Sequence, residues 1–194
     1  MKKLFNSIIL LILMTGCNND GFNESISTLE IQAPNGEYIA KSIDDLNIEI
    51  EKIVASQYGE DLKFDITSID YTPLDEGYLA NITYKVANGF THNLIRTNNA
   101  NILGNSKADK IEFVTIGKHK IMKESERLVL TNSSSRSGRS ATHTYVCKSA
   151  SNCSPCQVQA TITQPTAPGG QKDIKISCTD TCSDCKLEVT IIEQ

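Results

Sequence analysis

The chain lacks tryptophan, and aromatic residues make up only 6% of its 194 positions. No apolar run approaches the roughly 20 residues that a membrane-spanning helix needs, since even Ile8–Met14 is short. Basic residues are also scarce, with 19 Lys and Arg against 23 Asp and Glu. This balance excludes a generally basic nucleic-acid binder, because neutralising phosphates takes clustered Lys and Arg. The length suits one domain or two small ones with a mainly aliphatic core.

The N-terminus has the order of a secretory signal. Two lysines at positions 2 and 3 precede a largely apolar stretch, and small residues then lead to Cys17. The sequence Met14-Thr15-Gly16-Cys17 resembles the lipobox of bacterial lipoproteins. That resemblance implies removal of residues 1–16 as a signal peptide and acylation of Cys17, including an amide-linked chain such as palmitate. Two or more acyl chains are enough for stable membrane attachment.

The alternative is an ordinary secretory signal that happens to precede a cysteine. Removing residues 1–16 takes away two lysines and no acidic residue, so the formal charge falls from −4 to −6. No basic stripe remains to bind anionic lipids, so we expect membrane contact only through acyl chains on Cys17. Residues 17–27 are polar and read as a tether. Asn18 after the cysteine resembles outer-membrane sorting, which predicts a bacterial envelope location and leaves the membrane face open.

Residues 28–130 alternate between strand-like and helix-like patterns. Apolar residues recur at helical spacing from Ile43 onward, Ser42 and Asp45 resemble a capping box, and Gly59 can end the helix in a left-handed conformation. These signals predict a helix over residues 43–58. The preceding segment, 29–33, alternates like a half-buried strand.

The rest of this region predicts antiparallel strands. The apolar positions change phase near Thr67 and Ser68, which indicates a β-bulge. Asn88-Gly89 is a two-residue hairpin signal, and Lys110–Ile116 reads as a further strand. One helix on such a sheet gives an α+β domain. The order of elements resembles a cystatin-like or PepSY-like wrap, although no motif supports that resemblance.

Residues 131–142 are rich in serine and predict a linker, because they cannot bury enough surface to offset the entropy of ordering. Residues 143–194 then contain an internal repeat. Each copy has a lead-in strand, a cysteine, a polar loop, a Cys-x-x-Cys and an alternating strand that ends in Thr-Ile. We expect a small all-β module of two similar hairpins. Its cysteines are Cys147, Cys153 and Cys156 in the first copy and Cys178, Cys182 and Cys185 in the second.

Six cysteines in such a short exported segment favour a disulfide scaffold, because a body of this size rarely folds on its aliphatic core alone. Sequence alone permits many connectivities. The repeat favours pairings that map one copy onto the other. One such set is Cys153–Cys156, Cys182–Cys185 and Cys147–Cys178.

Metal binding and thiol redox chemistry are the alternatives for these cysteines. Cys153, Cys156, Cys182 and Cys185 could form a tetrahedral zinc site, to which His143 could contribute. Against zinc, six thiols exceed the needs of one site, and His143 is expected to be exposed beside the linker. Cys-Ser-Pro-Cys resembles a thioredoxin-type pair, but the residues after it alternate like a strand and provide no helix N-terminus.

No nucleotide-binding loop, nucleophile elbow or metalloprotease motif occurs in the sequence. His92 and His119 stand alone, and the paired carboxylates Asp44-Asp45, Glu60-Asp61 and Asp75-Glu76 fall at a helix start or in turns. We therefore expect a non-catalytic, cofactor-free envelope lipoprotein with a recognition or scaffolding role, which binds an unidentified protein or glycan and no nucleic acid. The alternative is a small zinc-binding or thiol-redox protein.

Overall fold

A computed structural model of the chain describes residues 31–59, 61–99, 101–102, 106–115, 118–122, 141–149, 156–165, 172–179 and 184–193. Over these ranges the fold is mixed α+β, as the sequence predicts. The elements are α2 (Ile43–Tyr58), β1 (Phe64–Pro73), β2 (Tyr78–Val86), β3 (Thr91–Thr97), β4 (Lys110–Thr115), β5 (Lys118–Met122), β6 (Ala141–Ser149), β7 (Val158–Thr163), β8 (Asp173–Cys178) and β9 (Cys185–Glu193).

Helix α2 has the predicted bounds and both predicted caps. The Ser42 hydroxyl accepts a hydrogen bond from the Asp45 N–H at 3.1 Å, which satisfies one of the free donors in the first turn. At the other end, Gly59 has φ 73° and its N–H donates to the Ala55 carbonyl at 2.8 Å. The helix is therefore defined locally, and tertiary contacts only select the face that it buries.

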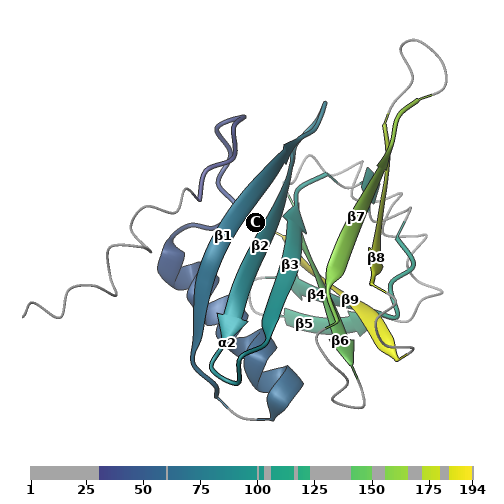
Figure 1. Cartoon of the computed structure of the whole chain (residues 1–194). Helices are drawn as coiled ribbons and strands as arrows, with labels where there is room; N and C mark the ends of the chain where they lie inside the picture. The colour runs from purple at the N-terminus through teal and green to yellow at the C-terminus, as the bar shows by residue number, and fades with distance from the viewer. Residues whose placement is uncertain are drawn as a thin grey trace, which may run out of the picture.

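Seven strands form one mixed sheet in the order β1-β2-β3-β6-β9-β4-β5 (Figure 1). Every neighbouring pair is antiparallel except β4 and β9, which run parallel. The predicted bulge is confirmed, because the β1–β2 register shifts between Ile66 and Ser68. The predicted hairpin at Asn88-Gly89 is also confirmed, with Gly89 at φ 92°. The expected strand at 29–33 is reduced, over its described residues, to one bridge between Gln32 and Tyr38.

The strands do not keep to the two bodies expected at 28–130 and 143–194. β6 pairs with β3, and β9 lies between β6 and β4 in the same sheet. The strands before residue 131 and those after residue 140 therefore do not form two separate sheets. The physical reason for this pairing is that the alternating pattern of a strand does not specify its partner. The composition of an intervening segment therefore does not decide which strands pair.

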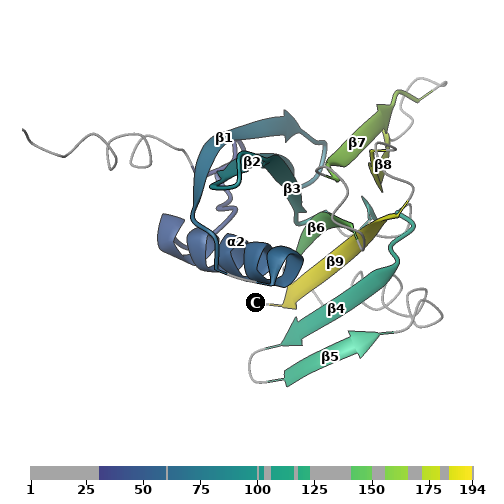
Figure 2. The same ribbon diagram turned by 60° about the horizontal axis from the view of Figure 1, so that its bottom comes forward.

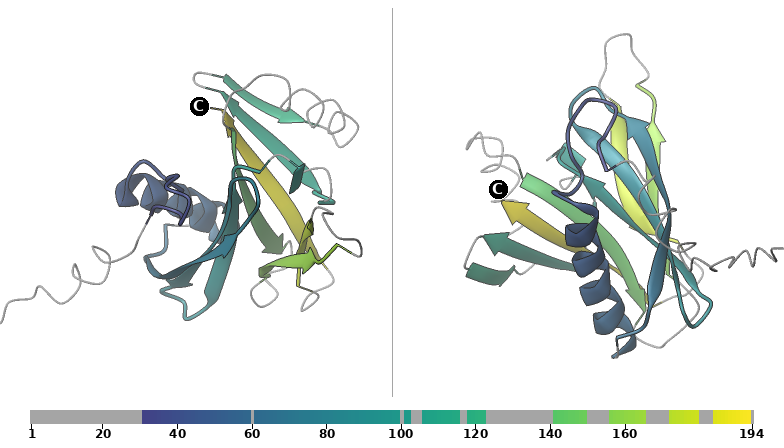
Figure 3. Two further views of the ribbon diagram at one scale, coloured as in Figure 1. Left: turned by 90° about the horizontal axis from the view of Figure 1, so that it is seen from above. Right: turned by 90° about the vertical axis from the view of Figure 1, so that its left-hand side faces the viewer.

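The sheet separates two apolar cores, and the ribbon in Figures 2 and 3 shows the elements that enclose them. Helix α2 packs under the arch formed by β1, β2 and β3, and the β7–β8 pair lies on the opposite face. Neighbouring residues on one strand therefore enter different cores, as with Tyr145 and Val146 on β6. The helix-side core includes Leu46, Ile50, Val54, Ala80, Ile82, Tyr84 and Leu94, and the other core includes Leu79, Ile95, Ile176, Leu187, Val189 and Ile191.

Several predicted features lie outside the described residues. They are the signal peptide at 1–16, Cys17, the tether at 17–27, the serine-rich residues 131–140, Cys153 and Cys182. In the part of the chain that is described, no helix has the length and apolar character needed to span a membrane.

Candidate functional site

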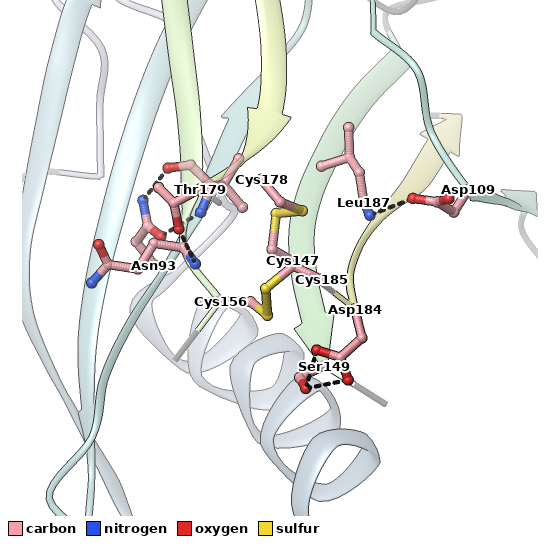
Figure 4. The surroundings of a disulfide bond; sticks show 12 residues. Asn93, Asp109, Cys147, Ser149, Cys156, Cys178, Thr179, Asp184, Cys185 and Leu187 are labelled. Carbon is pink, nitrogen blue, oxygen red and sulfur yellow. Dashed lines mark hydrogen bonds between the residues drawn. A yellow bond between two sulfur atoms is a disulfide. The ribbon is translucent and has the colours of Figure 1, made fainter. Parts of the chain in front are cut away.

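Two disulfides join the large sheet to the β7–β8 pair (Figure 4). Cys147 on β6 is bonded to Cys178 at the end of β8, and Cys156, just before β7, is bonded to Cys185 at the start of β9. The Cα–Cα distance is 5.7 Å in both, a typical value for a disulfide. Cys147 and Cys156 are almost completely buried. The crosslinks therefore run through the core between the layers.

The two sequence repeats are interlocked rather than folded as separate hairpins. The lead-in strand of each copy pairs with the exit strand of the other, which gives β6–β9 in the large sheet and β7–β8 in the small one. Equivalent positions also share one register. The matching pairs are Cys147–Leu187 with Cys178–Val158, Tyr145–Val189 with Ile176–Ala160, and His143–Ile191 with Ile174–Ile162.

This arrangement corrects part of the expected disulfide pairing. Cys147–Cys178 is present as expected, but Cys156 pairs with Cys185, so Cys153–Cys156 and Cys182–Cys185 are wrong. Both described bonds join the same position in the two copies. The interlocked register brings equivalent positions face to face across the layers, and this geometry decides the pairing.

The Cys156–Cys185 bond argues against both alternatives for the cysteines, which are zinc binding and thiol redox chemistry. With their sulfurs joined, Cys156 and Cys185 cannot act as the thiolate ligands of a site built from both Cys-x-x-Cys pairs. Cys156 is also not in a closed redox pair with Cys153. Within the described residues, no group of three or more His, Cys, Asp or Glu side chains is arranged to hold a metal ion.

Two of the three histidines, His92 and His143, are buried within the fold. His143 is 1% exposed, which corrects the expectation of an exposed residue, and burial lowers its pKa to about 4. His92 is also buried, and burial lowers its pKa. Its Nε2 lies 2.5 Å from the Tyr58 hydroxyl, and its ring stacks on Tyr84. Tyr58 is the last residue of α2, so this contact fastens the helix end to β3. The side chain of His119 is outside the described part.

A buried ion pair lies between α2 and the sheet. Arg96 Nη1 on β3 is 2.9 Å from Glu49 Oε2, with side-chain exposures of 7% and 21%. The Thr144 hydroxyl on β6 donates to Glu49 Oε1 at 2.8 Å. One carboxylate thus holds two neighbouring strands to the helix. The sequence signal for it is that Arg96 follows His92 and Leu94 at alternating positions of β3, on the face that they bury.

A polar pocket lies beside this ion pair, between the approach to α2 and the ends of β2, β3 and β6. Its volume is about 420 Å³. Ala40, Tyr78 and Thr142 are its buried residues, and burial raises the pKa of the Tyr78 hydroxyl, which lies near Thr142. The lining residues are Glu37, Tyr38, Ala40, Lys41, Tyr78, Asn98 and Thr142. Sequence reasoning missed this pocket, because its walls come from four separate segments.

Other residues singled out in the sequence lie apart from both features. Asp44 and Asp45 lie in the first turn of α2, where the positive end of the helix dipole stabilises their carboxylates. Asp75 is exposed, and its Oδ1 lies 3.8 Å from Lys172 Nζ. The ionic partner of Asp75 is therefore a lysine and not a second carboxylate. No known protein family matches this chain, and neither a curated protein nor a solved structure is significantly similar to it.

Proposed function

We propose that the chain is a lipid-anchored protein of the bacterial cell envelope with a non-catalytic recognition or scaffolding role. The observation that carries the proposal is the pair of interlayer disulfides, because such bonds form and persist in oxidising compartments. The lipobox-like Met14–Cys17 gives the route out of the reducing cytosol. A signal peptide at 1–16 and acyl chains on Cys17 follow from it.

Asn18 supports outer-membrane sorting, and residues 17–27 would tether the folded part to the membrane. The role in recognition or scaffolding rests on rigidity. Two disulfides, each worth about 2–4 kcal/mol, restrain the layers against each other. A body held in this way presents its surface with little loss of entropy when a protein or glycan partner binds.

For the fold, we propose a cystatin-like or PepSY-like wrap for α2 with β1, β2 and β3. Support comes from element order and from the position of the helix under the arch of these three strands (Figure 2). An experimental structure of the mature protein tests the resemblance. A helix that left this arch would contradict it.

Attachment is tested by cell fractionation of the full-length protein and of Cys17→Ala. We expect the wild type to partition into detergent and to incorporate labelled palmitate, and Cys17→Ala to enter the soluble fraction unlabelled. Asn18→Asp is a matched control, since it keeps the acylated cysteine and should move the protein to the inner membrane without releasing it. Detergent-dependent partitioning of Cys17→Ala equal to that of the wild type would refute lipidation at Cys17.

A further inference from the structure

The polar pocket has the size of a small-ligand site. Its volume of about 420 Å³ falls within the roughly 300–1,000 Å³ typical of such sites. A second described cavity, near Leu74 and Lys172, is smaller at about 180 Å³ and has no aromatic residue in its wall. The polar pocket is therefore the better candidate for a ligand site.

Hydrogen bonds fix one wall of the pocket. Glu37 Oε2 accepts from Asn98 Nδ2 at 2.6 Å and from Asn35 Nδ2 at 2.9 Å. Asn98 Oδ1 in turn accepts from the Tyr78 N–H at 2.9 Å. The second oxygen of Glu37 keeps its acceptor capacity, because these bonds use only Oε2. The carboxylate is thus held in place before any ligand binds, which lowers the entropy cost of binding.

The charges around the pocket balance. Glu37 and Lys41 in the lining have opposite signs, and Arg96, whose charge acts on the lining residue Tyr78, is paired with Glu49 at 2.9 Å. A strongly charged ligand would gain little from such a balanced set and would lose its hydration. The pocket therefore suits a neutral ligand with both hydrogen-bond donors and acceptors, because Lys41 donates, Glu37 accepts and the Thr142 hydroxyl does either.

An exposed aromatic ring completes the pocket. Tyr38 is 61% exposed and is one of the lining residues. A tyrosine ring offers an apolar face at low conformational cost. Covering this face with a ligand would remove apolar surface from water. A neutral ligand that is hydroxyl-rich at its edges and has an apolar C–H face matches both the ring and the polar groups.

We propose that the polar pocket binds a neutral sugar residue of an oligosaccharide, stacked on Tyr38 and hydrogen-bonded to Glu37 and Lys41. This deepens the proposed recognition role by naming the ligand class, and it rests on that role. Phe90 provides the comparison, since it is also an exposed aromatic residue, at 42%, but belongs to the β2–β3 turn and not to the pocket.

The test is a glycan array with neutral, sialylated and sulfated oligosaccharides, followed by calorimetric titration of the best ligand. The full mature protein is used in a detergent that carries no sugar. We expect binding of neutral glycans, about tenfold weaker binding for Tyr38→Ala, and unchanged binding for Phe90→Ala. Because the ligand is neutral, raising NaCl to about 1 M should change the affinity less than twofold.

Lys41→Met serves as a second variant on the polar side of the pocket, and it should also weaken binding. Thermal unfolding of each variant shows whether it still folds, and we expect all midpoints to match the wild type because the replaced side chains are on the surface. The proposal is overturned if no neutral glycan binds, if only acidic glycans bind, or if Tyr38→Ala and Phe90→Ala bind alike. Failure here leaves the envelope location standing, because fractionation of Cys17→Ala tests that separately.

Discussion

The side chain of Asn93 on β3 hydrogen-bonds to both main-chain polar groups of Val158 at the start of β7. Asn93 Nδ2 donates to the Val158 carbonyl at 2.8 Å, and the Val158 N–H donates to Asn93 Oδ1 at 2.9 Å. A third bond, from Asn93 Nδ2 to Asn81 Oδ1 at 2.7 Å, fixes the orientation of the amide. One side chain thus takes the place of a strand partner and joins the two layers at the edge of β7.

Replacing Asn93 should loosen this junction. We expect Asn93→Leu to lower the free energy of unfolding by about 2–3 kcal/mol, because it leaves the Val158 N–H and carbonyl without a partner. Asn93→Asp keeps the acceptor for the Val158 N–H but sets a carboxylate oxygen against the Val158 carbonyl, so it should also destabilise the fold. Urea denaturation measures both. Equal stability of Asn93→Leu and the wild type would contradict the bridging role.

The interlocked repeats predict how Cys153 and Cys182, the other two cysteines of residues 143–194, are paired. Cys153 and Cys182 occupy the same position in the two copies, and both described disulfides join like positions. We therefore predict a Cys153–Cys182 bond. Non-reducing mass spectrometry with alkylation should find no free thiol among the six cysteines of residues 143–194 and should recover a linked peptide pair.

Single variants sharpen that measurement. Cys153→Ser and Cys182→Ser should each release one alkylatable thiol, and the double variant should release none. Alkylation of both Cys153 and Cys182 in the unreduced wild type would contradict the pairing.

Acid should destabilise the fold through His143. Its pKa is about 4 in the folded protein and about 6.5 in the unfolded chain. Between these two pH values the unfolded chain therefore binds a proton at His143 that the folded protein does not bind. Stability contributed by the neutral ring is therefore present above about pH 6.5 and is lost as the pH falls towards 4, by up to about 3 kcal/mol. The buried His92 acts in the same direction.

The carboxylates also titrate in this range, so the comparison must be with a variant. Denaturation of the wild type and of His143→Leu between pH 7 and pH 4.5 isolates the histidine. We expect the wild type to lose more stability than the variant on acidification. Parallel curves for the two proteins would show that His143 does not carry the effect.

The Glu49–Arg96 pair should be costly to break from one side. Glu49→Gln leaves the buried guanidinium with a neutral partner, and we expect a loss of about 3 kcal/mol. Thr144→Val removes only the hydroxyl donor and should cost about 1 kcal/mol. The double variant Glu49→Met with Arg96→Met should cost less than the sum of its single changes, as chemical denaturation can determine. Additive effects would argue against coupling.

Local features of the fold were predictable because their causes are local. The caps Ser42 and Gly59 set the ends of α2, and the phase change at Thr67 marked the bulge. The candidate sites were harder to predict from the sequence. The polar pocket draws Lys41, Tyr78 and Thr142 from positions far apart in the chain, and no short pattern in the sequence joins them.

The sequence by itself determined the helix, the hairpin, the repeat and the set of cysteines, since each depends on spacing within a few residues or on residue type. Only the tertiary structure decided that β6 and β9 join the N-terminal strands in one sheet, and that Cys156 bonds to Cys185 rather than to its near neighbour. The physical reason is that strand pairing is non-local. An alternating strand fits many partners, and the shared burial of two faces of one sheet selects among them.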